Sequence, residues 1–113
     1  MTNASAPCWQ DRRTDETRGV ERILREAGFE RVDAYRYNSA SIRVRVVDPR
    51  FEGLSTEKRD EMVEPHIEKL PEETQADIMF LLTVAPSELE GDARAFKHIP
   101  MNAEFEDPSP SSL

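Results

Sequence analysis

The side chains that most often ligate metals or act as nucleophiles are few in this sequence and lie far apart. The chain has one cysteine, Cys8, and two histidines, His66 and His98. A single cysteine excludes an internal disulfide and a zinc site built from several cysteines. Two histidines without paired spacing are typical of ordinary surface or half-buried side chains. We therefore expect no metal site and no Ser/His/Asp or Cys/His catalytic set.

Other patterns that would indicate an enzyme are also missing from the sequence. The 4 glycines are too scattered to form a phosphate-binding loop. The acidic pair Glu72-Glu73 is typical of a solvated connector, whereas a general acid and base would need burial to tune their pKa values. We predict that the protein is not an enzyme and that it uses no cofactor.

The net charge of −8 is unevenly distributed. Residues 1–60 hold 12 basic and 11 acidic groups, while residues 61–113 hold 3 basic and 12 acidic groups. The acidic half would repel DNA or RNA, because phosphate contacts supply most non-specific affinity. The arginines of the first half could offset this repulsion: Arg43 and Arg45 alternate along an expected strand, and Arg12, Arg13, Arg18, Arg22 and Arg25 cluster near an expected helix. A solvated face is the ordinary interpretation of these arginines, and a nucleic-acid patch is the alternative.

The length and hydropathy of the chain indicate one small domain outside the membrane. The chain has 113 residues and a mean hydropathy of −0.69. The longest apolar run, residues 78–82, is far shorter than the ~18 residues that a membrane span needs. Residues 1–10 lack the basic start and apolar stretch of a secretory signal. We expect a cytoplasmic protein.

The elements expected in the first half are a helix and a hairpin. Val20, Ile23, Leu24 and Ala27 share one helical face, which predicts a helix over residues 15–27 that ends at Gly28. Residues 31–37 and 41–48 alternate in polarity and are joined by turn residues, so we expect two antiparallel strands.

The second half predicts another helix and a third strand. A helix over residues 56–70 contains Pro65, which predicts either a kink or a break near Val63. Residues 77–84 are apolar on both faces, which is typical of a central strand or of a strand covered by a tail. The order α-β-β-α-(α)-β predicts an α+β fold with a three-stranded mixed sheet and helices packed on one face.

The two ends are expected to be mostly disordered. Residues 1–14 are polar without periodicity, and residues 91–113 form an acidic tail rich in proline and serine. The single domain would then span residues 15–90. Apolar side chains between residues 96 and 105 could patch the sheet or could be loose, and the sequence leaves both possibilities open.

A partly exposed sheet face is the candidate interaction surface. It would present four side chains of the types that most often anchor protein interfaces: Tyr35, Tyr37, Arg43 and Arg45. The alternative is that the tyrosines pack on the C-terminal segment.

One motif resembles the BolA family, over roughly residues 18–89. Its residues are Phe51, Glu52, Gly53, Leu54 and Ser55, followed by Arg59 and then by Thr83, Pro86 and Glu88. The resemblance implies a fold similar to the class II KH arrangement. It also implies a monothiol glutaredoxin partner and a shared [2Fe–2S] cluster, held by a histidine at the start of the last strand and by a histidine or cysteine of the hairpin loop.

Both of these implied ligands are absent here. Counting back from Thr83 places the strand histidine at Asp77, and the hairpin loop, residues 37–41, contains neither histidine nor cysteine. Because cluster iron needs thiolate or imidazole donors, we predict that the chain does not hold the cluster in the family manner. The predicted function is a BolA-like protein-binding, adaptor or regulatory module. The alternative is a KH-like nucleic-acid-binding regulator, although the chain lacks the Gly-x-x-Gly loop of KH modules.

Overall fold

The computed structural model describes residues 9–89 and 98–111. Its elements follow the order α-β-β-α-α-β with an additional helix at the end. They are η1 (Trp9–Arg12), α1 (Asp15–Glu26), β1 (Arg31–Asn38), β2 (Ser41–Val47), η2 (Pro49–Phe51), α2 (Thr56–Ile67), α3 (Glu72–Asp77), β3 (Ile78–Val84), η3 (Pro86–Leu89) and α4 (His98–Glu106). Among the helices described, none is long and apolar enough to cross a membrane.

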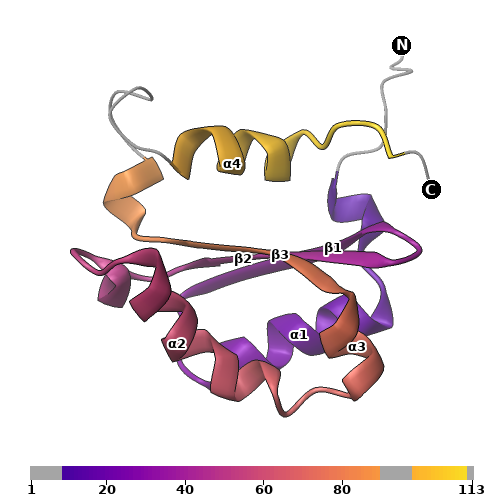
Figure 1. Cartoon of the computed structure of the whole chain (residues 1–113), viewed down its shortest axis with the longest axis horizontal. Coiled ribbons are helices and arrows are strands. Elements are labelled where there is room, and N and C mark those ends of the chain that lie inside the picture. Colours follow the sequence, from indigo (N-terminus) through magenta and orange to yellow (C-terminus); the bar gives the residue numbers. More distant parts are fainter. Residues whose placement is uncertain (1–8, 90–97, 112–113) are drawn as a thin grey trace.

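The three strands form one mixed sheet in the order β1-β2-β3. β1 and β2 pair antiparallel, and β2 and β3 pair parallel. Figure 1 shows α1, α2 and α3 on one side of the sheet and α4 on the other. The predicted α+β fold, its mixed three-stranded sheet and its element order are confirmed. The prediction of helices on one face holds for α1, α2 and α3, while α4 adds a layer that we did not expect.

α1 forms where the periodicity predicts it, because both of its ends are well defined. At its start, the Thr14 hydroxyl accepts from the Thr17 backbone N–H and the Thr17 hydroxyl accepts from the Thr14 N–H. At its end, Gly28 adopts a φ of 99°, which favours glycine. Val20 and Leu24 are fully buried between these ends and bring the helix onto the sheet.

Alternation along the hairpin separates two chemically different faces of the sheet. Val32 and Ala34 on β1 lie opposite Val46 and Val44 on β2, and these side chains join Ile42 in the main core under the helices. We call this side the aliphatic face. Tyr35, Arg43 and Arg45 alternate with these residues and point to the other side of the sheet, toward α4. The hairpin register therefore decides which side chains meet the helices.

α2 is continuous through Pro65. Ser55 caps its N-terminus by accepting from the Lys58 backbone N–H, and the helix ends at Ile67, only two residues after the proline. A proline this near the end removes a backbone bond from the last turn only, so the break predicted near Val63 does not form. The shorter helix α3 follows as a separate element.

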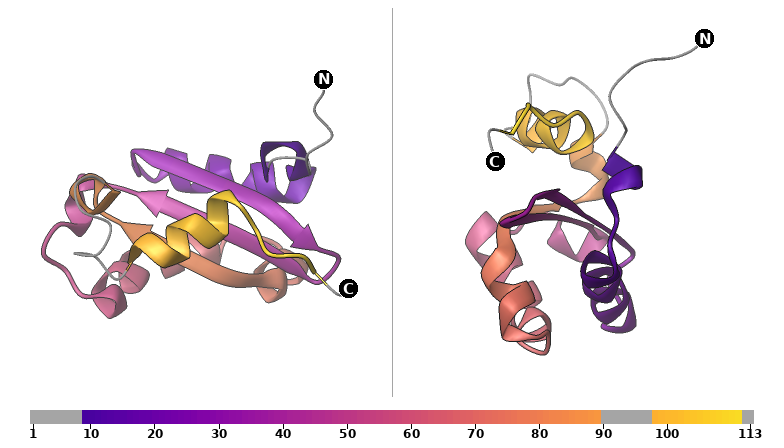
Figure 2. Two further views of the ribbon diagram at one scale, coloured as in Figure 1. Left: turned by 90° about the horizontal axis from the view of Figure 1, so that it is seen from above. Right: turned by 90° about the vertical axis from the view of Figure 1, so that its right-hand side faces the viewer.

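β3 lies at an edge of the sheet and is not its central strand. The alternative interpretation of its two apolar faces, a strand covered by a tail, is confirmed, because α4 packs over it. Figure 2 shows α4 running across the sheet in its left view, and α4 and α1 on opposite sides of the sheet in its right view.

The predicted disorder at both ends is wrong where the structure describes them. Residues 98–106 form α4, and Trp9–Arg12 form η1 with Trp9 buried. The physical reason is a small aromatic cluster, in which Phe105 packs between Trp9 and Tyr35 and so joins the two ends over the sheet. Residues 13–14 and 107–111 are described and form neither helix nor strand, and residues 1–8, 91–97 and 112–113 lie outside the described residues.

Candidate interaction surfaces

The face that the sequence analysis proposed as a contact surface is covered by α4. We call it the arginine face, formed by Tyr35, Tyr37, Arg43 and Arg45. Tyr35 is fully buried, and Arg45 and Arg43 are 1% and 9% exposed. The expectation of a partly exposed face is therefore wrong. The alternative, in which the tyrosines pack on the C-terminal segment, is confirmed, because Tyr35 Oη donates to the Phe105 carbonyl at 2.9 Å and Tyr37 Oη donates to the Ser109 carbonyl at 2.7 Å.

Carboxylates of α4 pair with both arginines of this face. Arg43 Nη1 lies 2.8 Å from Glu104 Oε2. Arg45 pairs with Glu106, and its other nitrogen lies 2.7 Å from Asp33 Oδ2. Arg43 and Arg45, two of the arginines that a nucleic-acid patch could use, are thus neutralised within the chain.

Aromatic rings complete the contact between α4 and the sheet. The Phe105 ring centroid lies 4.9 Å from that of Tyr35 and 5.3 Å from that of Trp9. The Arg45 guanidinium lies 4.5 Å from the Phe105 ring centroid, within the range of a cation–π interaction. Trp9 Nε1 donates to Glu106 Oε1 at 3.2 Å, so the indole has a polar partner as well.

Sequence reasoning missed Trp9, Glu104 and Glu106, and it left open whether Phe105 packs on the sheet. A signal for them was present in the spacing of charges. Glu104 and Glu106 flank Phe105 with the same two-residue separation that Arg43 and Arg45 have on β2. Charge matching of two distant segments does not appear in an analysis of one segment at a time.

The contact shifts the pKa of Glu104 and of Tyr35. The Ser109 hydroxyl and backbone N–H, together with Arg43, lower the pKa of Glu104 from 4.5 to about 2. Burial raises the pKa of Tyr35, against the opposing effect of the Arg43 guanidinium. Both groups therefore keep their neutral-pH form: Glu104 stays charged toward Arg43, and Tyr35 stays a hydroxyl donor.

A second region lies at the end of the sheet where β1 turns into β2. Asp77 closes α3, and its Oδ2 lies 3.0 Å from Arg36 Nη2. The same nitrogen lies 3.3 Å from Glu16 Oε1 on α1. Asn38 closes the turn by accepting the Ala40 backbone N–H at 2.8 Å. Where the resemblance places a histidine, the structure has an ion-paired carboxylate.

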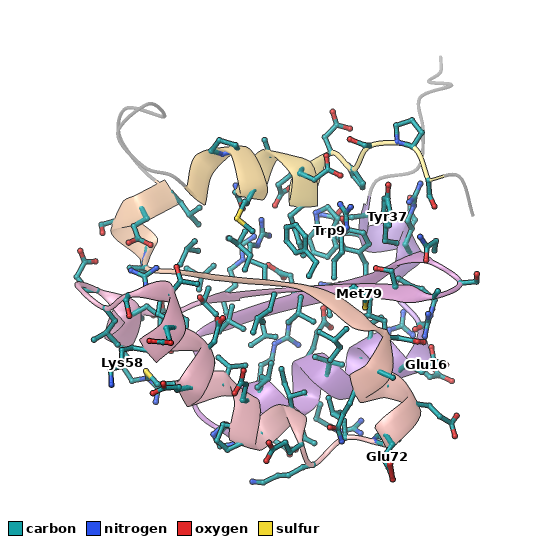
Figure 3. All side chains as sticks on the ribbon, viewed as in Figure 1. Trp9, Glu16, Tyr37, Lys58, Glu72 and Met79 are labelled. Atoms are coloured by element: carbon teal, nitrogen blue, oxygen red, sulfur yellow. The ribbon has the colours of Figure 1, made fainter. Side chains whose placement is uncertain are left out.

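Met79 is the most exposed large apolar side chain of the described residues, at 70%. It lies at a register irregularity in β3, because Ile42 pairs with Ile78 while the next residue of β2, Arg43, pairs with Phe80. Such bulges redirect side chains and are common beside functional sites. Figure 3 shows Met79 in the half of the molecule that also holds Tyr37 and Glu16. Met79 and Asp77 form the exposed edge of this second region.

The motif that carries the BolA resemblance has a structural role in this chain. Phe51 is fully buried in the core, Gly53 has a φ of 75°, and Ser55 caps α2. Glu52 accepts from the Ser87 hydroxyl at 2.7 Å, and Leu54 is 37% exposed. The motif therefore makes the crossing from β2 to α2.

Arg59 extends this role to the end of β3. Its side chain is 2% exposed, and its two terminal nitrogens donate to the two carboxylate oxygens of Glu88 at 2.7 Å each. It also donates to the carbonyls of Leu54 and Thr83 at 3.0 Å. Bidentate pairs of this kind are among the strongest hydrogen-bonded contacts in proteins. Arg59 thereby fixes α2 against the loop that follows β3.

The histidines and the cysteine form no shared site in the part of the chain that the structure describes. His66 packs edge-on against Phe29, with ring centroids 5.9 Å apart. Cys8 lies outside the described residues, as does the side chain of His98. No group of three or more His, Cys, Asp or Glu residues that could hold a metal occurs among the described residues.

Comparison with known proteins identifies the fold. No protein-family model matches the sequence, and no curated protein matches it. A solution structure of BolA1 protein from Mus musculus matches all of this chain and 87% of that chain, with a TM-score of 0.55 and 19% sequence identity. The chain has a BolA-like fold. The BolA-like body agrees with the resemblance carried by the motif around Gly53, and the likeness at this level of identity concerns the fold.

Proposed function

We propose that this protein is a non-catalytic, BolA-like protein-binding adaptor whose partner contacts the end of the sheet marked by Asp77 and Met79. The observation that carries the proposal is the exposure of Met79 on a bulge of an edge strand, two residues after the position at which the resemblance places a ligand. The fold supports a regulatory or adaptor role, because the resemblance implies such a role for BolA-like proteins.

The chemistry of this region suits a protein partner. A methionine side chain is flexible and polarisable, and it is enriched at adaptable binding surfaces. The ion pairs of Arg36 with Asp77 and with Glu16 provide a charged rim beside Met79. An apolar anchor with a polar rim is the usual composition of a protein interface.

The partner that the resemblance implies is a monothiol glutaredoxin, and we propose that this chain binds it without ligating its cluster. The carboxylate of Asp77 replaces the implied imidazole and is engaged by Arg36. Iron in such clusters prefers thiolate and imidazole donors. Binding would therefore depend on the protein surface and leave the cluster to the glutaredoxin.

The test is an NMR titration of the isotope-labelled chain with a monothiol glutaredoxin. We expect shifts at Arg36, Asp77 and Met79, and no visible cluster absorption assigned to this chain. Met79→Ser should weaken binding by about tenfold, the effect of losing ~1.4 kcal/mol from an interface anchor. Leu54→Ser is the matched control, because Leu54 is also an exposed apolar side chain and lies in the crossing to α2.

Two results would contradict the proposal. The first is a titration without shifts in the region of Asp77 and Met79. The second is a stable cluster spectrum that is lost on Asp77→Asn, because it would show that this carboxylate ligates iron.

A further inference from the structure

The arginine face has an unusual composition for a buried layer. Arg45 and Arg43 are nearly inaccessible, whereas the other face of the same strand carries Ile42, Val44 and Val46. Well-packed apolar side chains in place of buried ion pairs are often neutral or stabilising, so stability alone does not explain this choice. A face that must exist both covered and open would need polar side chains.

The arginine face retains partners of its own without α4. Asp33 on β1 pairs with Arg45 at 2.7 Å, and the Tyr35 hydroxyl accepts from Arg43 at 3.3 Å. Neither contact involves α4. Water could hydrate the remaining guanidinium N–H groups of an open face, which it could not do for valine or isoleucine.

α4 meets this face in the manner of a bound peptide helix. Asn102 and Glu106 both contact Arg45, and Phe105 inserts between the aromatic rings of the sheet and η1. These three residues have the i, i+3, i+4 spacing by which a helix anchors in a groove. Met101, by contrast, is 42% exposed.

The length of α4 also fits a helix that forms on docking. It has 9 residues, and isolated helices below about 12–15 residues are marginal in water. Its stability must therefore come from its contacts with the sheet. A helix from another chain with the same anchors could use the same contacts.

We propose that the arginine face is a recognition site for an acidic helix of a partner protein that carries a phenylalanine between carboxylates, and that α4 occupies this site as an intramolecular ligand. The proposal rests on the proposed protein-binding function, but it concerns the arginine face, whose four residues include neither Met79 nor Asp77. Complementarity argues for this partner: two guanidinium groups and an aromatic pocket select two carboxylates and a ring.

Trp9 gives a direct readout, because it is the chain's 1 tryptophan and packs on Phe105. The probe is a synthetic peptide with the sequence of residues 98–111, which contains no tryptophan. It is titrated into the full-length wild type and into the full-length Phe105→Ala variant. We expect the variant to bind the peptide about tenfold more tightly than the wild type, with a blue shift of Trp9 emission, because its own α4 competes less.

Matched variants make the test specific. In the Phe105→Ala background, Arg43→Gln should weaken peptide binding by about tenfold, the expected effect of losing a charge-assisted pair. Met101→Ala, made in the same Phe105→Ala background, is the control within α4. It should leave the affinity for the peptide unchanged, because the Met101 side chain is 42% exposed. If Phe105→Ala does not fold by circular dichroism, Glu104→Gln replaces it.

Three results would overturn the proposal. One is no peptide binding to the folded variant at millimolar concentration. Another is equal binding of a peptide with alanine in place of phenylalanine. The third is concentration-dependent dimerisation of the wild type, since a second copy's α4 would then be the occupant. If the peptide does not bind but the glutaredoxin still shifts the signal of Asp77, this proposal alone is overturned. If the peptide binds but the glutaredoxin causes no shift at Asp77, the proposed function alone is overturned.

Discussion

The two faces of the same three strands are built from opposite chemistry. The aliphatic face carries Val44 and Val46 against α1 and α2, while the arginine face carries Arg43 and Arg45 against α4. Alternating residues of one strand thus serve two kinds of contact. The aliphatic face is stabilised by burial without directional partners, whereas the contact of the arginine face with α4 also needs a helix with matching carboxylates.

The two helical layers therefore contribute differently to the molecule. The layer formed by α1 and α2 creates the BolA-like body. The layer formed by α4 depends on a few directional contacts around Phe105 and two arginines. We expect changes in the first layer to affect the whole body, and changes in the second to affect α4 and its surroundings alone.

The largest effect is expected from Arg59, the buried arginine of α2. Arg59→Leu leaves the carboxylate of Glu88, whose side chain is 13% exposed, without its bidentate partner. Breaking a buried pair in this way costs about 3–5 kcal/mol of unfolding free energy. Chemical denaturation followed by circular dichroism measures it. A loss below about 1 kcal/mol would show that Arg59 does not fix α2 to the loop after β3.

A change on the aliphatic side should come next. Leu24→Ala removes a fully buried side chain from the core and should cost about 2–5 kcal/mol. Trp9 fluorescence and circular dichroism should then shift to lower denaturant concentration together. In Phe105→Ala, only the Trp9 signal should change strongly, and an equal shift of both signals there would remove the distinction between the layers.

A smaller effect is expected at the crossing between β2 and α2. Gly53 has a φ of 75°, and a Cβ there would meet no atom within 4 Å, so we attribute the cost of Gly53→Val to backbone strain and not to a clash of the Cβ. We expect about 1–3 kcal/mol of destabilisation by thermal unfolding. Gly19→Ala is the control, because Gly19 lies within α1 with open space around it and should gain about 0.5–1 kcal/mol. An unchanged melting temperature for Gly53→Val would contradict the strain.

The smallest effect concerns the pH dependence of α4 docking. The pKa of Glu104 is lowered from 4.5 to about 2, so its contribution is complete above pH 4.5 and is lost as the pH falls toward 2. Trp9 emission should shift to longer wavelength over that range. Asp33 and Glu106 also face Arg45, so the comparison with Glu104→Gln isolates Glu104. Glu104→Gln should lack the part of the Trp9 emission change that Glu104 causes. Identical titration curves for the wild type and Glu104→Gln would show that Glu104 does not cause it.

The sequence predicts the BolA-like body well and the layer formed by α4 poorly. Val20 and Leu24 in α1 and the alternation of β2 carry strong periodic signals, because apolar burial needs a regular stripe or alternation. α4 has no such stripe: Phe105 is its buried ring, and its other contacts with the sheet are made by polar groups such as Glu104, Glu106 and Asn102. Its docking depends on pairing two segments about sixty residues apart, which local patterns do not record.

The candidate sites show the same limit. Counting along the resemblance leads to Asp77, which is the last residue of α3 and directly precedes β3, but its pairing with Arg36 needs the fold. Tyr35, Arg43 and Arg45 were expected on a partly exposed surface, because tyrosine and arginine usually anchor interfaces. They do form an interface, and its occupant is the chain's own C-terminal helix.

Native-state hydrogen exchange tests the separation of the two layers most directly. Amides of α4 around Phe105 should exchange through a local opening of much lower free energy than amides of β2 around Val44, and Trp9 should become accessible to a quencher in the same opening. Equal opening free energies for α4 and β2 would contradict the account, because they would show that the arginine face opens only when the whole body unfolds.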